Sequence, residues 1–100
     1  MTPRLTHEAF VNNLHTMFRI RLNDSVIIET ELTEVSEQQL SARQERFAIV
    51  FRGPLESYLG QGLRRFEHDQ MGEFDLFIVP ISRDDKGVYY EAVFNLLPEN

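Results

Sequence analysis

The side chains of this sequence that could take part in acid–base or metal chemistry are its three histidines and the carboxylates beside them. His7 and His15 are eight residues apart, a spacing that does not suit two ligands of one metal ion. His68 stands between Glu67 and Asp69, and it could relay a proton or bind a metal only if a further carboxylate converged on it. We favour the simpler interpretation, in which His68 is a surface residue at a turn.

Glu67 and Glu91 form a second candidate, because two carboxylates in different environments can divide the roles of acid and base. Both fall in segments that we expect to be strands facing one another. Neighbouring arginines would neutralise them and turn the arrangement into solvated ion pairs, which is the interpretation we favour. The arginines available for this are Arg19, Arg21, Arg64 and Arg65.

Three familiar motifs are absent or incomplete. Gly60-Gln61-Gly62 precedes an expected strand, whereas a phosphate-binding glycine loop needs a helix N-terminus after it. Residues 84–87, Asp-Asp-Lys-Gly, lack the alternating ligands of a calcium loop and are typical of a hairpin turn. No Gly-x-Ser-x-Gly occurs, so no serine is placed on a nucleophile elbow. The sequence therefore predicts no catalytic residue, no metal site and no cofactor.

Composition narrows the function further. The chain has 100 residues, ten basic and sixteen acidic side chains, a net charge of −6 and no cysteine. This length predicts one domain over residues 1–100. The lack of cysteine excludes disulfides, thiolate metal sites and thiol catalysis, and the acidic balance argues against nucleic-acid binding. Neither a signal-peptide core nor a membrane-length apolar run occurs, so we expect a cytoplasmic protein or a component of a soluble or phage-like particle.

Hydrophobic periodicity predicts one short helix followed by strands. Thr6 is a suitable N-cap, and Phe10 and Leu14 share one helical face. From Met17 onward apolar side chains recur at every second position, which is typical of strands with one buried face. Short turns between these segments favour a mainly β fold: a small six-stranded antiparallel barrel or two-sheet sandwich with one short N-terminal helix. The expected bounds are 5–15 for the helix and about 17–22, 26–35, 46–52, 63–68, 73–81 and 88–96 for the strands.

The side chains around residues 69–71 predict how two of these strands pair. A three-residue loop at this point would set Phe66 opposite Phe74, which brings two aromatic rings together. The same register would set Arg65 opposite Asp75, which matches opposite charges. We therefore expect a hairpin with this register.

Other segments deviate from simple strands. The alternation slips between Leu32 and Val35, which predicts a β-bulge or a strand end. Pro80 cannot donate a ladder hydrogen bond, so it predicts a strand end or an edge position. Residues 36–45 are polar and predict an exposed connection with a helical turn. This connection and the loop over 53–62 are the segments in which we expect function to reside.

Five short motifs are distributed along the second half of the chain: Phe-Arg-Gly-Pro at 51–54, Gln-Gly at 61–62, Phe-Glu-His at 66–68, the run over 72–80, and Tyr-Glu-Ala-Val-Phe-Asn at 90–95. In these motifs the sequence resembles a family of small uncharacterised bacterial proteins, a domain of unknown function. Members of that family are often encoded near proteins with a phage tail-collar domain. The resemblance implies an accessory or structural role in a phage-tail-like assembly, and it implies no catalytic residues.

We therefore expect a non-enzymatic interaction or structural protein, an adaptor or chaperone in a phage-tail-like or surface assembly. Its expected partner is a protein, either tail-collar-like or a second copy of this chain, with no nucleic acid and no membrane. Two alternatives stay open: a small-ligand-binding β-barrel with an internal cavity, and a small hydrolase or isomerase that uses His68 with a carboxylate. The candidate ligand or interface residues are Arg64, Glu67, His68, Tyr90 and Glu91.

Overall fold

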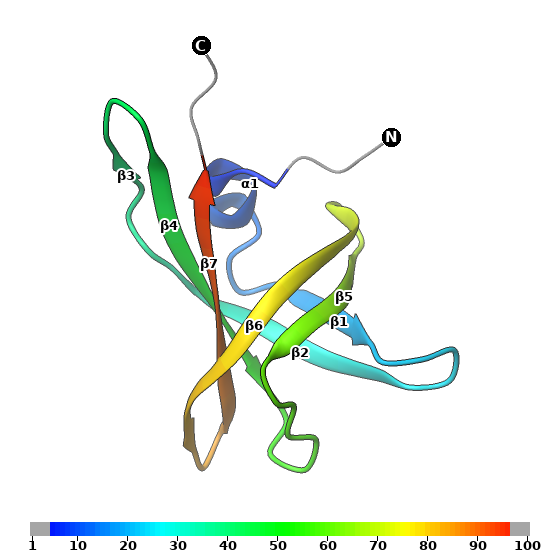
Figure 1. The fold of residues 1–100 in the computed structure, drawn as a ribbon. Helices are drawn as coiled ribbons and strands as arrows, with labels where there is room; N and C mark the ends of the chain where they lie inside the picture. Colours follow the sequence, from blue (N-terminus) through cyan, green and yellow to red (C-terminus); the bar gives the residue numbers. More distant parts are fainter. Residues whose placement is uncertain (1–4, 97–100) are drawn as a thin grey trace.

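The computed structural model describes residues 5–96 and contains one helix and seven strands (Figure 1). Helix α1 covers His7–Asn12. In chain order the strands are β1 (Met17–Arg21), β2 (Ile27–Val35), β3 (Gln39–Leu40), β4 (Glu45–Gly53), β5 (Gly62–His68), β6 (Gly72–Asp84) and β7 (Gly87–Leu96).

Six of these strands close into an antiparallel barrel. Hydrogen-bonded neighbours follow the order β2-β1-β5-β6-β7-β4-β3, and an additional pairing of β2 with β4 joins the two sides of the sheet. β3 lies outside the ring, where it pairs with the beginning of β4. Closure pairs the strand edges that an open sandwich would expose. The predicted mainly β antiparallel fold is confirmed, and the barrel is the form that the chain adopts.

Phenylalanine side chains fill the middle of the barrel. Phe51 lies between Phe18 and Phe66, with ring centroids at 5.2 and 4.8 Å. Phe74 stacks on Phe66 from the neighbouring strand, with the ring centroids 5.8 Å apart. All four side chains are buried. Aromatic packing from β1, β4, β5 and β6 thus occupies the space in which a wider barrel would hold a ligand.

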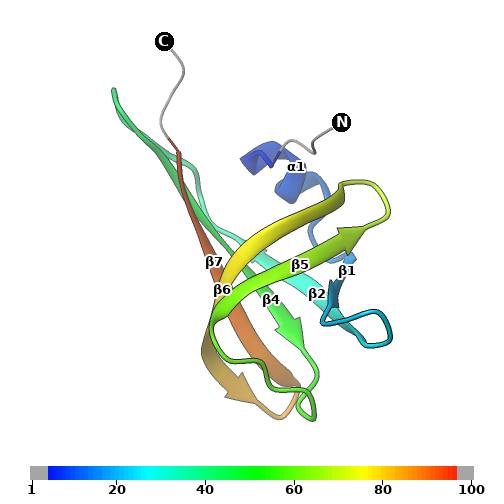
Figure 2. The same cartoon turned by 45° about the vertical axis from the view of Figure 1, so that its right-hand side comes forward.

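Helix α1 plugs the end of the barrel at which β6 and β7 separate. These two strands pair between Val79 and Asp84 on β6. In the part of β6 that precedes Val79 the two strands diverge, and α1 lies between them (Figures 1 and 2). Phe10 of the helix is fully buried there. Its ring lies 6.2 Å from that of Phe74 on β6 and 5.4 Å from that of Phe94 on β7. One phenylalanine therefore bridges the gap between the two strands.

The helix is shorter than the expected range of 5–15. Thr6 caps it as predicted, since its side chain accepts a hydrogen bond from the backbone N–H of Ala9 at 3.1 Å. The helix ends at Asn12 because the chain soon needs a sharp turn into β1. His15 makes that turn in the left-handed conformation, with a φ of 67°, which a right-handed helix cannot contain.

The hairpin of β5 and β6 has the predicted register. Phe66 lies opposite Phe74, and Arg65 lies opposite Asp75, so both parts of the prediction are confirmed. The loop closes with Gly72 at a φ of 81°, a left-handed conformation that glycine adopts without strain.

The predicted irregularity in β2 is also confirmed, because the register with β4 shifts between Leu32 and Glu34. The prediction for residues 36–45 is wrong in one respect. Instead of a helical turn, this connection contains β3, which continues the course of β2 along the edge of β4. Ser36 helps to hold it there, since its N–H donates to the carbonyl of Ala48 at 2.8 Å.

Pro80 does not end its strand, because β6 continues to Asp84. The register between β6 and β7 shifts between Pro80 and Ser82. A proline is tolerated at such a bulge because the ladder is already interrupted there. The strand end predicted at residue 81 is therefore wrong.

Candidate functional site

Side chains alternate between the inside and the outside of the barrel along β5 and β6. On β5 the burial pattern places residues 64, 66 and 68 toward the interior and residues 63, 65 and 67 toward solvent. The outward side chains near the turn at residues 69–71 are charged, whereas those farther along the same two strands are apolar. The outer surface of this hairpin therefore has two parts of opposite chemistry.

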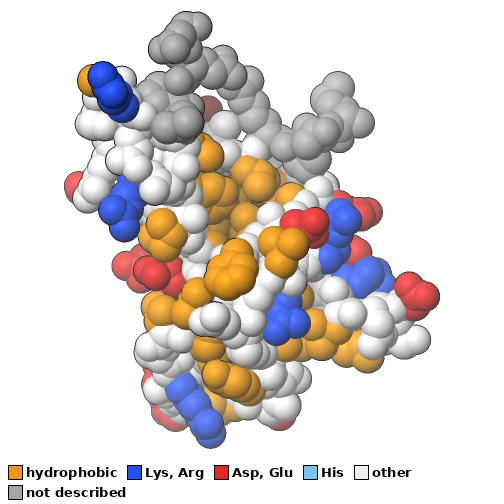
Figure 3. Space-filling view, in the orientation of Figure 1, with side chains coloured by type: hydrophobic (Ala, Val, Ile, Leu, Met, Phe, Trp, Pro, Cys, Tyr) orange, Lys and Arg blue, Asp and Glu red, His pale blue; other side chains and the backbone are white. Residues whose placement is uncertain are grey.

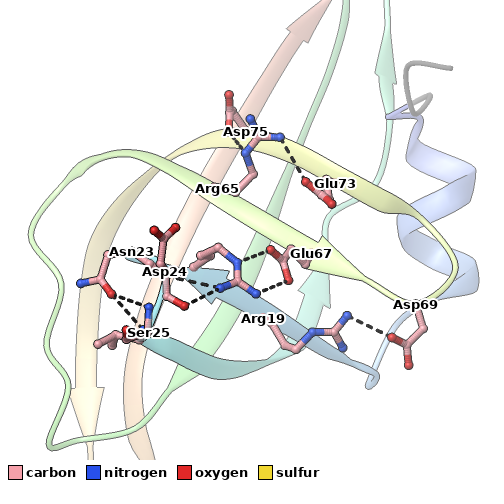
Figure 4. A network of polar contacts seen from close by, with 11 residues as sticks. Arg19, Asn23, Asp24, Ser25, Arg65, Glu67, Asp69, Glu73 and Asp75 are labelled. Carbon is pink, nitrogen blue, oxygen red and sulfur yellow. Dashed lines mark hydrogen bonds and ion pairs between the residues drawn. The ribbon is translucent and has the colours of Figure 1, made fainter.

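The first part, the charged half, is a network of ion pairs between the hairpin and β1 (Figure 4). Arg21 donates two hydrogen bonds to Glu67, from Nε to Oε2 at 2.5 Å and from Nη2 to Oε1 at 3.3 Å. Arg19 forms an ion pair with Asp69, with Nη2 3.0 Å from Oδ1. The charged half comprises Arg19, Arg21, Arg65, Glu67, Asp69, Glu73 and Asp75.

Each arginine of the charged half has a carboxylate partner within the chain. Nε of Arg65 lies 3.1 Å from Oδ1 of Asp75, and Nη1 of Arg65 lies 3.8 Å from Oε1 of Glu73. The hydrogen bond from Arg21 lowers the pKa of Glu67, and the same contact raises the pKa of Arg21. Both groups thus hold their charges more firmly than free side chains do. The expected pairing of Glu67 with a neighbouring arginine is present, but its side chain is only 17% exposed, so this pair is partly buried rather than solvated.

His68 is buried at the base of the β5–β6 turn, with an exposed fraction of 6%. Its Nδ1 accepts hydrogen bonds from the backbone N–H groups of Gln70 and Met71, both at 3.1 Å, and its Nε2 lies 2.9 Å from Oγ1 of Thr16. The ring packs on that of Phe18, with centroids 4.1 Å apart. Burial lowers the pKa of His68. The prediction of an exposed histidine is wrong, because His68 has the inward orientation of its strand.

Tyr90 and Arg64 also face inward and hold the loop over residues 53–62. Tyr90 is buried, and its hydroxyl accepts a hydrogen bond from the backbone N–H of Leu59 at 2.9 Å. Nη2 of Arg64 donates to the carbonyl of Gly60 at 2.9 Å, while its Nε is buried without a partner among the described residues. These contacts give both side chains a part in fixing the loop.

The five candidate residues do not come together. Glu67 points outward from β5, and Glu91 points outward from β7. Because β6 lies between these two strands, the carboxylates do not face one another, and the prediction that they would is wrong. His68 points to the other side of the sheet from Glu67, with both ring nitrogens engaged. Within residues 5–96, no group of three or more histidines and carboxylates is placed to hold a metal ion.

Glu91 lies instead beside an open hollow of about 430 Å³ on the outside of the barrel. The hollow is lined by residues of β4, of β7 and of the connection that contains β3. Glu37 and Arg46 line it together with Val93. It is a surface depression with mixed chemistry, and none of its lining residues has a buried side-chain polar atom that lacks a hydrogen-bond partner.

The second part of the outer surface, the apolar outer patch, begins directly beside the charged half. Leu63 lies opposite Phe77 in the register, and these side chains are 67% and 54% exposed. Hydrophobic side chains gather along the middle of this face, over β6 and between β6 and β7 (Figure 3). We define the apolar outer patch as Leu63, Phe77, Ile81 and Val93, of which the last two are about half exposed.

Sequence reasoning missed this patch, although a signal for it exists. Residues 76–81 are apolar at both odd and even positions. A strand with one buried face needs apolar residues only at alternate positions, and β6 has one face in solvent. Phe77 therefore has no role in the core. Leu63 carries the same signal, because it shares the outward orientation of Arg65.

Comparison with known proteins places the chain in a family without assigning an activity. Residues 5–94 match DUF6916, a domain of unknown function, and the chain belongs to this family. Neither the curated proteins nor the solved structures contain a match. Across the part of the chain that the structure describes, none of the helical segments has the length and apolar character needed to traverse a bilayer.

Proposed function

We propose that this protein is a non-enzymatic interaction module that docks a protein partner through the apolar outer patch. The observation that carries the proposal is the exposed cross-strand pair of Leu63 and Phe77. A large aromatic side chain on a strand contributes most when it is buried, yet this one lies in solvent. Contiguous exposed apolar side chains with a polar rim are typical of protein interfaces, and here the charged half supplies such a rim.

The polar candidates support a role other than catalysis. His68 uses both ring nitrogens in contacts within the chain, and Tyr90 uses its hydroxyl to hold Leu59. A general base needs a free lone pair within reach of a substrate proton. The aromatic packing inside the barrel likewise favours a solid scaffold over a ligand-binding cavity.

The proposed partner is a tail-collar-like protein, and the proposed role is that of an adaptor or accessory subunit in a phage-tail-like assembly. This part rests on the resemblance of the motifs and on the chemistry of the patch. Structural subunits of large assemblies associate through surfaces of this kind, with an apolar centre and charged surroundings.

The test is to mix the purified chain with a tail-collar-domain protein from the same genome and to measure complex formation by size-exclusion chromatography with light scattering. We expect a complex with the unmodified chain and at least about tenfold weaker binding after Phe77→Ser, because interface aromatic residues often dominate affinity. Ile27→Ser is the matched control, since Ile27 is an exposed apolar strand residue outside the patch, 42% exposed.

Equal binding by the two variants would overturn the role of the patch. If the chain alone forms a dimer that Phe77→Ser dissociates, the partner is a second copy rather than the collar-domain protein. A chain that stays monomeric and does not bind the collar-domain protein would contradict the proposed partner.

A further inference from the structure

A chain of hydrogen bonds connects the β5–β6 turn to the end of helix α1. The backbone N–H groups of Gln70 and Met71 donate to Nδ1 of His68. Nε2 of the same ring contacts Oγ1 of Thr16 at 2.9 Å, and this hydroxyl donates to the carbonyl of Asn13 at 2.7 Å. Asn13 is the C-cap residue of α1, so the histidine stands between a turn of the barrel and the helix that plugs it.

The pattern of donors fixes the protonation state of the ring. Two backbone N–H groups point at Nδ1, so this nitrogen must offer its lone pair and carries no proton. The ring is then neutral, with its proton on Nε2, from which it donates to Thr16. A second proton on Nδ1 would point at two N–H donors, so the turn could not keep its present geometry. Nε2 would still donate to Thr16, and this contact is lost only when the ring moves with the opening turn.

The helix that this chain of bonds secures covers an aromatic surface. Phe10 fills the gap between β6 and β7, in contact with Phe74 and Phe94. The helix has six residues, and a helix of that length does not persist without tertiary contacts. Whatever loosens its attachment should therefore free it from the barrel end and expose these rings.

We propose that His68 is an acid-sensitive latch, whose protonation opens the β5–β6 turn and releases helix α1 from the end of the barrel. The rest of the barrel is held by strand pairing that does not involve this ring. The release is therefore a local opening that precedes unfolding of the strands. Burial of the ring also disfavours its protonated form and lowers the pKa of His68. The opening therefore occurs below the pH at which a free histidine titrates.

The charges around His68 do not prevent this opening. Asp69 in the turn favours the protonated ring and Arg19 on β1 opposes it, and these two side chains pair with each other at 3.0 Å. In the connection after α1, Nδ1 of His15 lies 3.2 Å from Oε2 of Glu31 on β2, and Nε2 of His7 on α1 lies 2.9 Å from the carbonyl oxygen of Ser36. Neither of these contacts involves the β5–β6 turn, so the other two histidines serve as internal controls.

The test is hydrogen–deuterium exchange of the full chain near pH 7.5 and near pH 5, corrected for the intrinsic exchange rates. We expect the amides of Gln70 and Met71 and those of Phe10 to Leu14 to exchange at least about tenfold faster at the lower pH, while the β4–β7 ladder stays protected. In His15→Gln both pH effects should remain.

Two further variants separate the latch from general acid sensitivity. Thr16→Val keeps a branched side chain but removes the hydroxyl, so the helix amides should exchange fast at both pH values while the turn amides keep their pH dependence. His68→Asn should remove the pH dependence of both segments. If His68→Asn does not fold, the Thr16→Val result still decides. Equal pH effects on the helix in Thr16→Val and the unmodified chain, or simultaneous loss of protection in all strands, would overturn the proposal.

Discussion

Two neighbouring cross-strand pairs on the β5–β6 hairpin differ in how completely the chain satisfies them. Arg65 and Asp75 lie opposite each other and form an ion pair at 3.1 Å. The next outward pair, Leu63 and Phe77, has the same register and the same outward orientation, yet its side chains are more than half exposed. The first pair belongs to a network that is complete within the chain. The second has apolar surface that the fold does not use.

This difference teaches where a function can be sought. In the charged half every arginine already has a carboxylate, so a ligand or partner would have to compete with existing pairs. In the apolar outer patch a partner would only displace water, which favours association. The patch, and not the polar residues that the sequence first points to, is therefore the better candidate for binding.

The largest expected effect comes from comparing two phenylalanines on opposite sides of the hairpin. Phe66 is fully buried and Phe77 is 54% exposed. We expect Phe66→Ala to lower the free energy of unfolding by about 3–5 kcal/mol, because it removes a ring from the packed interior. Phe77→Ala should lower it by less than about 1 kcal/mol. Urea denaturation measures both, and a loss for Phe77→Ala as large as that for Phe66→Ala would mean that the fold needs the patch.

The sequence alone predicts how the strands of the barrel pair better than it predicts which surface residues could bind a partner. The rings and charges around residues 69–71 are enough to predict the register, because each pair has an obvious match across the turn. The burial of His68 could not be predicted, since its partners are backbone N–H groups and Thr16, which lies far away in sequence. The apolar run over residues 76–81 marks Phe77 as a candidate for exposure, but whether another element covers this face depends on the tertiary fold.

A smaller effect is expected from the acid titration of the charged half. Arg21 lowers the pKa of Glu67, so the folded state holds this charge more firmly than the unfolded chain does. The resulting stabilisation is complete above the ordinary glutamate pKa of about 4.3 and is lost as the pH falls through the lower pKa of the folded state. Glu67→Gln should therefore be less stable than the unmodified chain at neutral pH, and the difference should shrink in acid.

Thermal denaturation at about pH 7 and about pH 3 measures this difference. Glu73→Gln is a suitable control, because its carboxylate lies 3.8 Å from Arg65 and the structure gives it a longer contact than Glu67 has. A Glu67→Gln variant that is as stable as the unmodified chain at neutral pH would show that the Arg21 contact contributes nothing, and the two halves of the surface would then be equally dispensable to the fold.

The smallest effect on stability is expected when the chemistry of the charged half is extended into the patch. Leu63→Lys combined with Phe77→Glu would place opposite charges in a register that already supports Arg65 and Asp75. We expect the free energy of unfolding to change by less than about 0.5 kcal/mol, measured by urea denaturation, since both positions are on the surface. A large loss of stability would indicate that the two side chains pack against the barrel more than their exposure suggests.

The most direct measurement of the central claim is a nuclear magnetic resonance titration of the isotope-labelled chain with a tail-collar-domain protein, the partner proposed above. If the patch docks this partner, the resonances of Leu63, Phe77, Ile81 and Val93 should change together, while that of Ile27, an exposed apolar residue outside the patch, should stay in place. Changes confined to the charged half, or no changes at any partner concentration, would contradict the account.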